Sequence, residues 1–261
     1  MYALALSGPD PAALRDRLAS GLAHRGPVAV VERADAVGPA PDGVASTYRL
    51  AEDGRYDATA AAADLDALLE SLAADHGLAL VQGFDGVDLP RVAVGVGDAG
   101  DALVAAPTLE SLDPTAVDAA LDDVEPIVTL ESLVARVKAA EGAERAGAIA
   151  TFTGRVRARD DPDDVETTAL EFEKYEGVAD ERLADLEREL SAREGVYEVR
   201  LHHRTGVLEA GEDIVFVVVL AGHRDEAFET VSDGIDRLKA EVPLFKKEVT
   251  VEDAFWVHER A

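Results

Sequence analysis

The chain has 261 residues, a formal net charge of −28 and no cysteine. That length is enough for two modest domains, and the lack of cysteine excludes disulfides, thiolate metal sites and a cysteine nucleophile. The acidic balance argues against nucleic-acid binding, and the chain has no run of about 18 apolar residues that would predict a membrane span. The N-terminus has neither a basic region nor a long apolar core, so we expect a cytoplasmic protein without a signal peptide.

The first half alternates buried strands with helices, which predicts a parallel α/β sheet. A strand at residues 2–7 is followed by a helix and by a second strand at 27–31. A loop at 37–43 leads to a helix from about Asp57 to His76, and strands are predicted at 78–81 and 92–96 around a glycine-rich loop. The apolar stripes of the two helices consist of Leu14, Leu18 and Leu22 in the first and of Leu65, Leu68, Leu69 and Leu72 in the second.

This layout, and especially the stretch LALVQGFDGVDLPRVAV, resembles the molybdopterin-guanine dinucleotide biosynthesis protein B family, which has a P-loop fold. A P-loop needs the pattern G-x-x-x-x-G-K-[ST], whose amides and lysine hold phosphates. After the first strand this chain has only Ser7-Gly8-Pro9-Asp10-Pro11, with no lysine, two prolines that lack amide donors, and a carboxylate that repels phosphate. We therefore expect residues 1–122 to be a degenerate P-loop-like α/β domain without its nucleotide site.

An acidic, proline-containing stretch at 121–126 predicts the linker, so the second domain is expected to span residues 123–261. Strands separated by single helices and hairpin-like turns predict an α+β domain with a largely antiparallel sheet. The expected elements are a helix at 130–140, strands at 147–157 and 167–175, a helix at 178–194, a strand at 196–204, a turn at 206–211, a strand at 214–221, a helix from about 223 to 242, and a last strand at 247–251, after which residues 255–257 close the chain. The helix at 178–194 is expected to bury one face, formed by Ala179, Leu183, Leu186 and Leu190.

The last helix carries an apolar face and ends among lysines. Its core residues are expected at Phe228, Val231, Ile235 and Leu238, and Pro243 ends it. The chain has five lysines, and Lys239, Lys246 and Lys247 fall near this end. Lysine at a helix C-terminus can also simply complement the helix dipole.

Cations also follow two strands of this half. Arg155 and Arg157 come after the first strand, and His223 and Arg224 come after the long apolar strand. An isolated arginine is most often solvated or salt-bridged, and His202-His203 within a strand is most often structural. Cations at several element ends in so acidic a chain nevertheless predict a bound phosphate or carboxylate.

Four stretches of this half resemble the catalytic, or large, subunit of molybdopterin synthase. They are GAIATFTGRVR, LEFEKYEGVADERL, HHRTGVLEAGEDIVFVVVLAGHRDEAFE and DRLKAEVPLFKKE, followed by Trp256. The match runs from about Ile127 to the C-terminus in the order and spacing of the family.

The resemblance implies an α/β hammerhead fold and a homodimer. Each end of that dimer takes a small ubiquitin-like sulfur-carrier subunit, giving a heterotetramer. The Gly-Gly thiocarboxylate of the carrier enters the site, where cyclic pyranopterin monophosphate (precursor Z) is converted to molybdopterin. No metal and no resident cofactor are expected.

Carried onto this chain, the resemblance implies a substrate pocket of Arg155, Val156, Arg157, His223, Arg224, Lys239, Lys246, Lys247, Glu248 and Arg260. Lys239 and Lys246 match the two catalytic lysines of the family. Such residues suit the reaction, since arginine and histidine can bind the cyclic phosphate and a lysine can supply a proton.

Two alternatives stay open. One is a non-catalytic scaffold that binds a ubiquitin-like protein, and the other is a GTP-binding accessory protein in cofactor delivery. The dispersed acidity points separately to a high-salt cytoplasm, in which self-repulsion is screened.

Overall fold

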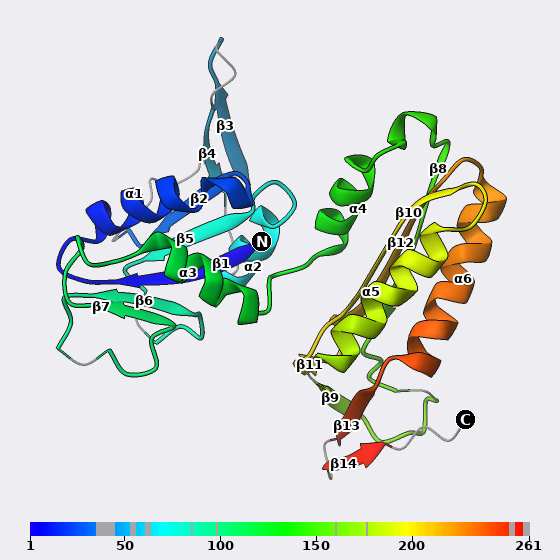
Figure 1. Cartoon of the computed structure of the whole chain (residues 1–261). Coiled ribbons are helices and arrows are strands. Elements are labelled where there is room, and N and C mark those ends of the chain that lie inside the picture. The colour runs from blue at the N-terminus through cyan, green and yellow to red at the C-terminus, as the bar shows by residue number, and fades with distance from the viewer. Residues whose placement is uncertain are drawn as a thin grey trace. The chain divides into compact units, whose positions relative to one another are not determined.

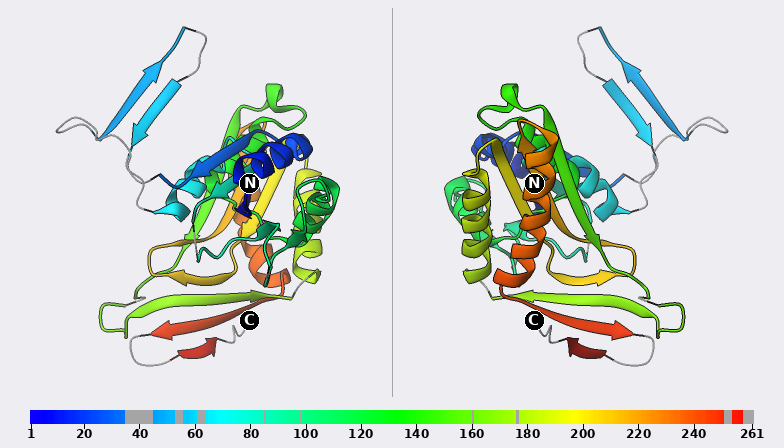
Figure 2. Two further views of the ribbon diagram at one scale, coloured as in Figure 1. Left: turned by 90° about the vertical axis from the view of Figure 1, so that its left-hand side faces the viewer. Right: turned by 90° about the vertical axis from the view of Figure 1, so that its right-hand side faces the viewer.

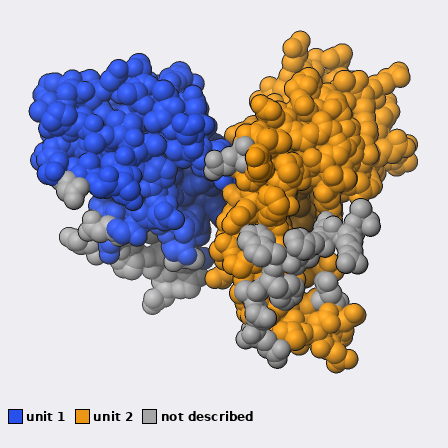
Figure 3. Space-filling model, turned by 60° about the horizontal axis from the view of Figure 1, so that its bottom comes forward, with its two compact units in different colours: residues 1–129 blue, residues 130–261 orange. Residues whose placement is uncertain are grey.

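The computed structural model describes residues 1–34, 45–52, 56–60, 64–84, 86–97, 99–159, 161–175, 177–250 and 254–257. The chain divides into two compact units, Met1–Thr129 and Leu130–Ala261 (Figure 3). The sequence placed the boundary between residues 122 and 123. Residues 123–129 lie in the first unit, where the Met1 amino group donates to the Ile127 carbonyl (2.9 Å) and the Ile127 amide donates to the Met1 carbonyl (2.8 Å). This pairing fastens the end of the unit to its first strand.

The first unit is built on a five-stranded parallel sheet in the order β2-β5-β1-β6-β7 (Figure 1). Its strands are β1 (Tyr2–Ser7), β2 (Val28–Glu32), β5 (Leu78–Gln82), β6 (Arg91–Val94) and β7 (Val104–Ala106). Its helices are α1 (Pro11–Gly21), α2 (Leu65–Leu72) and α3 (Pro114–Ala120). A separate antiparallel pair is formed by β3 (Ser46–Leu50) and β4 (Tyr56–Ala60). The predicted parallel α/β sheet is therefore confirmed.

Helices cover this sheet on both faces because successive strand residues point to opposite sides. On one face, α1 and α3 pack Leu14, Leu18 and Val117 against Leu4 and Leu80. The core of the other face groups α2 with alternate strand residues, namely Ala3, Ala29, Val31, Leu69, Ala79 and Val81. Burying one such leucine contributes about 1.5–3 kcal/mol, so both predicted leucine stripes account for much of the core.

The helix that was predicted from Asp57 to His76 is shorter than expected. Residues 56–60 form β4, and α2 begins only at Leu65. The Asp64 carboxylate accepts a hydrogen bond from the Ala67 amide (2.9 Å), which satisfies a donor of the first turn and sets the start of the helix. Strand β7 was missed because a run of three residues carries too little periodicity. The predicted loop at 37–43 lies outside the described residues.

The second unit is antiparallel, as predicted, but its strands form two sheets where the sequence predicted one. Their strand orders are β10-β12-β8 and β11-β9-β13-β14. The strands are β8 (Ala148–Arg155), β9 (Thr167–Lys174), β10 (Val196–His203), β11 (Gly206–Glu209), β12 (Asp213–Ala221), β13 (Leu244–Thr250) and β14 (Ala254–Val257). The helices are α4 (Leu130–Lys138), α5 (Val178–Ser191) and α6 (Arg224–Glu241). In the parts of the chain that the structure describes, no helix is both long and apolar enough to cross a membrane.

The core of this unit lies between the three-stranded sheet and the pair α5 and α6 (Figure 2). Leu186 and Leu190 of α5 and Leu238 of α6 pack against Val217 and Val219 of the central strand. All five side chains are almost completely buried. The residues that the sequence assigned to α5 are thus confirmed as its inner face.

Phe228 does not lie on the inner face of α6, contrary to the prediction, and is 64% exposed. The face against the sheet contains small residues instead, including Ala227 and Gly234. A Cβ on Gly234 would lie 3.2 Å from Val217 Cγ1, so the helix approaches the sheet too closely for a larger residue there. This close approach turns Phe228 outward. The Ile235 and Leu238 assignments are confirmed.

Two strand boundaries also differ from the sequence prediction. The predicted turn at 206–211 contains β11, which pairs with β9, and the predicted strand at 247–251 begins earlier, at Leu244. In both places hydrogen bonding to β9 extends the strand beyond what its own alternation of side chains suggested. The earlier start of β13 places Lys246 inside the sheet.

Candidate active site

Chain direction brings several predicted site residues to one end of the second unit. Strand β8 ends at Arg155, beside Asp213 at the start of β12. Strand β12 runs to the opposite end of the sheet, and α6 then returns, so that Lys239 in its last turn lies at the end marked by Arg155. Figure 2 shows α6 leading there into β13, which lies with β9 across that end. The four-stranded sheet therefore lies along one side of the candidate site.

The segment after β8 is anchored between the two sheets. Arg155 Nε lies 3.2 Å from Asp213 Oδ1, and its guanidinium also donates to the Gly211 carbonyl. Val156 is 2% exposed and packs against Leu170 and Phe172 of β9. Arg157 is exposed. Burial of Val156 thus sets the position of the two arginines on either side of it.

The lysine pair of β13 is divided between the two faces of its sheet. Lys246 is directly opposite Phe172, and Lys247 is directly opposite Glu171. Since paired residues of antiparallel strands point to the same side, Lys246 shares the face of buried Phe172, which packs against Val156. Lys247 points to the other face, where its Nζ lies 2.8 Å from Glu171 Oε2.

Glu248 lies on the same face as Lys246, two residues along the strand. Its carboxylate accepts a hydrogen bond from the hydroxyl of Thr167, which is 6% exposed. Lys246 itself is half-buried. An ammonium and a carboxylate therefore stand next to each other beside the Arg155–Arg157 segment, an arrangement that suits binding of an anion and proton transfer.

The two ends of α6 separate the remaining predicted residues. Lys239 is exposed in the last turn, whereas His223 caps the first turn and Arg224 begins the helix. Eighteen residues make α6 about 27 Å long at a rise of about 1.5 Å per residue. One chain therefore does not bring His223 and Arg224 to the lysines. Arg260 lies outside the described residues.

The sequence indicated a structural role for His203 and no role for Lys174, yet both lie at this end of the unit. The ring of His203, at the end of β10, meets the Phe172 ring edge-on with centroids 4.7 Å apart. Lys174 ends β9 opposite Leu244, so it shares the face of Phe172 and Lys246. The alternation of residues 170–174 carried this signal, because a lysine two positions after a buried phenylalanine points to the same side.

His202 is, like His203, a half-buried imidazole, and it stacks on Phe216 with ring centroids 6.3 Å apart. Burial, and then the nearby charges of His203 and Lys174, lowers the pKa of His202 from 6.5 to about 4. The unfolded chain thus takes up this proton at a higher pH than the folded chain does. Folding stability is therefore unaffected by this group above pH 6.5 and falls as the pH drops from about 6.5 to about 4.

We expect a His202→Phe variant, which keeps the stacking, to lose less stability on acidification than the unmodified chain. At about 1.4 kcal/mol per pKa unit the difference reaches roughly 2 kcal/mol at pH 5. Chemical denaturation at pH 7.5 and 5 in molar KCl measures it. His223→Asn, which replaces an exposed imidazole, serves as the control and should keep the original pH dependence. Equal slopes for all three proteins would contradict the expectation.

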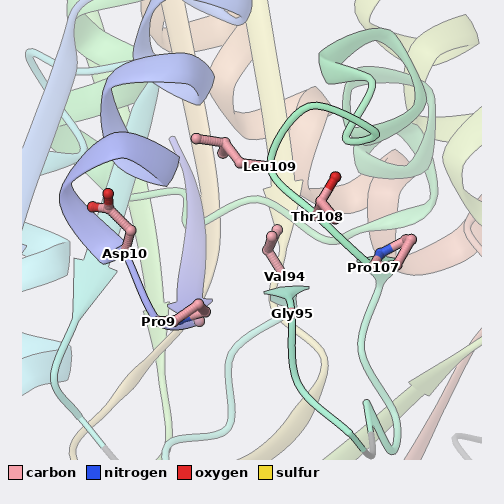
Figure 4. Close-up of a pocket in the computed structure, with 8 residues that line it drawn as sticks. Pro9, Asp10, Val94, Gly95, Pro107, Thr108 and Leu109 are labelled. Carbon is pink, nitrogen blue, oxygen red and sulfur yellow. The ribbon is translucent and has the colours of Figure 1, made fainter.

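The first unit has a cavity at the carboxyl edge of its sheet, where α/β folds commonly bind ligands (Figure 4). Its volume is about 220 Å³, and its walls come from the loops after β1, β6 and β7. The lining residues are Gly8, Pro9, Asp10, Val94, Gly95, Pro107, Thr108 and Leu109.

The loop beside this cavity has few donors for a phosphate. Pro9 and Pro11 lack amide hydrogens, and the Asp10 carboxylate accepts from the Ala13 amide (3.0 Å), which occupies the N-terminus of α1. A Cβ on Gly8 would lie 2.6 Å from the Val94 carbonyl oxygen, so the loop is pressed against β6. Residues 8–11 of the described chain thus offer few donors to a phosphate, in line with the missing P-loop lysine of the sequence.

Comparison with known proteins covers both units. Residues 125–241 match the family model described as MoaE protein. A Haloferax volcanii protein described as "Probable molybdopterin synthase" is 50% identical over 263 residues, which is 100% of both chains. The molybdopterin synthase catalytic subunit of Escherichia coli (strain K12) is 40% identical over 114 residues, 44% of this chain and 75% of that protein.

Among solved structures, molybdopterin synthase from Staphylococcus aureus aligns with a TM-score of 0.42 and 32% identity, covering 44% of this chain and 83% of that one. The decisive comparison is with the Haloferax volcanii protein, because it extends over both units at 50% identity. On that similarity, the chain belongs to the molybdopterin synthase family.

Proposed function

We propose that the second unit converts cyclic pyranopterin monophosphate to molybdopterin, with sulfur delivered on the thiocarboxylated C-terminus of a small ubiquitin-like carrier. The chain is an enzyme of molybdenum cofactor biosynthesis, and the reaction takes place in the cytoplasm. The observation that carries the proposal is the pairing of Lys246 with Phe172, which directs the lysine toward Val156 and the two arginines beside it. The names of the similar proteins support the same activity.

Each residue type has a defined task in this reaction. Arg155 and Arg157 bind the phosphate oxygens, since guanidinium groups suit such acceptors. Lys239 and Lys246 stabilise the negative charge that develops as the cyclic phosphate opens, and a lysine ammonium supplies a proton to the leaving oxygen. Glu248, held by Thr167, keeps a carboxylate beside Lys246. The carrier supplies the sulfur, so the chain itself needs no cysteine.

A second copy of the chain completes the site in this proposal. His223 and Arg224 belong to the substrate pocket by family resemblance, yet α6 holds them about 27 Å from the lysine end of the same chain. A homodimer that places the N-terminus of one α6 near Lys239 of the partner resolves the separation. Together with two carriers it forms a heterotetramer.

The test is to incubate the purified chain with thiocarboxylated carrier and precursor Z and to assay molybdopterin. Formation of product supports the enzyme, whereas carrier binding without product at saturating substrate would favour the scaffold alternative.

The same assay tests whether each site takes residues from two chains. A mixture of inactive Lys246→Ala and inactive His223→Ala–Arg224→Ala chains regains activity if each site takes residues from two chains, and stays inactive if one chain suffices.

For the first unit we propose a P-loop-like domain that has lost its nucleotide site. The strand order β2-β5-β1-β6-β7 supports it, and so does the donor-poor loop at Gly8–Pro11. No lysine occurs before Lys138, so no other lysine of this unit replaces the missing P-loop lysine. The alternative of a GTP-binding accessory protein rests on this unit and is disfavoured by the same residues.

We expect residues 1–122 to bind neither GTP nor ATP, and residues 123–261 to keep the synthase chemistry. Calorimetry of the full chain with Mg-GTP tests the first statement. Micromolar binding that is abolished by Gly8→Val or Asp10→Ala would show it to be wrong. For the second statement, the shortened chain of residues 123–261 is compared with the full-length Asp10→Ala variant. Both should form molybdopterin at the rate of the unmodified chain.

A further inference from the structure

Lys174 is a lysine of the second unit that neither the sequence motifs nor the family resemblance assigns a role. It ends β9 directly opposite Leu244, the first residue of β13. Lys246, two residues along β13, is its diagonal neighbour on the same face, and such neighbours lie about 7–8 Å apart. Two ammonium groups therefore share this face of the sheet at the end of the unit where α6 finishes.

The surroundings of Lys174 direct it toward the site. The Tyr175 amide, next in the chain, donates to the Pro243 carbonyl (3.4 Å), which joins the end of β9 to the turn between Lys239 and Lys246. Lys174 Nζ lies 3.1 Å from Asp180 Oδ1 in the first turn of α5, and its side chain is 24% exposed. Its positive charge also contributes to lowering the pKa of His202, which lies near the end of β10 in the three-stranded sheet.

We propose that Lys174 is a third lysine of the substrate site and binds an anionic oxygen or sulfur group of a reactant. Two reactants carry such a group, the small substrate in its cyclic phosphate and the carrier in its thiocarboxylate tail. The proposal rests on the proposed function. Asp180, in the first turn of α5, competes with the reactant for the ammonium group, because its carboxylate already lies within 3.1 Å of Lys174 Nζ.

A purely structural ion pair would behave differently from a binding residue, and one matched pair of variants separates the two roles. Lys174→Gln removes the ammonium, and Asp180→Asn removes only its carboxylate partner. If the ion pair serves the fold alone, both variants have the same effect. If Lys174 binds a reactant, only the first weakens binding, and the second leaves it unchanged or strengthens it.

The experiment measures kcat and KM for each reactant separately. We expect Lys174→Gln to raise the KM of one of the two roughly three- to tenfold at an unchanged kcat, which is the usual loss for a partly exposed charged contact. Which KM rises identifies the phosphate or the thiocarboxylate as the bound group. Lys174→Arg should restore most of the affinity. Lys138→Gln, which makes the same charge change at an exposed position of α4, should match the unmodified chain.

Calorimetry with the carboxylate form of the carrier and with inorganic phosphate measures the contact without turnover. It therefore tests Lys174 even if the assay shows no molybdopterin, an outcome that would refute the proposed function instead. Unchanged affinity for both probes in Lys174→Gln would overturn the inference. Equal weakening in Lys174→Gln and Asp180→Asn would overturn it as well, because the pair would then act only through the fold.

Discussion

Replacing Lys246 by alanine is expected to lower the synthase rate by about 10²–10⁴-fold while the protein stays folded, because losing a positioned proton donor typically costs that much. Lys246 is half-buried on the face of Phe172, beside Glu248 and the arginine segment. Lys239→Ala is expected to act in the same direction, since Lys239 lies in the last turn of α6 at the same end of the unit. Steady-state assays at saturating carrier measure both losses.

The neighbouring Lys247 provides a matched control. Its ammonium lies on the opposite face of β13 and is paired with Glu171 at 2.8 Å. The family resemblance includes Lys247 in the pocket, but its pairing with Glu171 holds the ammonium on the other face of the sheet. We therefore expect Lys247→Ala, which removes the same charge one residue away, to retain activity within about tenfold of the unmodified chain. Equal losses at Lys246 and Lys247 would indicate a general effect of charge on the acidic chain. Activity within a few-fold for both Lys239→Ala and Lys246→Ala would refute the assignment of catalytic lysines.

The chain is expected to lose structure in dilute buffer and to regain it in molar KCl. Acidic residues exceed basic ones by 28, and this excess is spread along the chain. The screening length falls from about 10 Å at 0.1 M salt to about 3 Å at 1 M, so repulsion between neighbouring carboxylates is largely removed. A gain of several kcal/mol corresponds to a rise in Tm of roughly 10–20 °C for a chain of this size. Circular dichroism melts between 0.1 and 2 M KCl measure the change.

Sucrose distinguishes screening from a general strengthening of apolar burial. It stabilises folded proteins because it is excluded from their surface, yet it carries no ions. Sucrose at the same osmolality should therefore restore much less stability than KCl does. A Tm that stays constant from 0.1 to 2 M KCl, or that rises equally in sucrose, would contradict the electrostatic explanation.

Local patterns in the sequence were sufficient for most elements of both units. Leu14 and Leu18 in α1, and Leu186 and Leu190 in α5, recur at helical spacing, and all four are buried as predicted. The continuous apolar run of β12 likewise indicated a central strand, because only a strand covered on both sides can be apolar throughout. Such patterns are read over a few neighbouring residues, so they do not depend on the rest of the fold.

The motifs also indicated candidate side chains for the site, but their spatial grouping depended on tertiary structure. The division of Lys246 and Lys247 between two faces follows from the pairing of β13 with β9, and the sequence alone began that strand one residue too late to include Lys246. The outward position of Phe228 follows from the close packing of Gly234 on Val217. Spacing along the chain marks one side of an element, but only the neighbour packed there decides whether that side is buried.

The distance between the two ends of α6 is the clearest case. His223 and Lys239 belong to one motif-rich stretch, and a reading along the chain places them together. An uninterrupted helix of 18 residues holds its ends about 27 Å apart, because each residue adds a rise of about 1.5 Å. The sequence by itself therefore determined the residue types of the candidate site and the helix between them, whereas the tertiary structure decided which of these residues can meet within one chain.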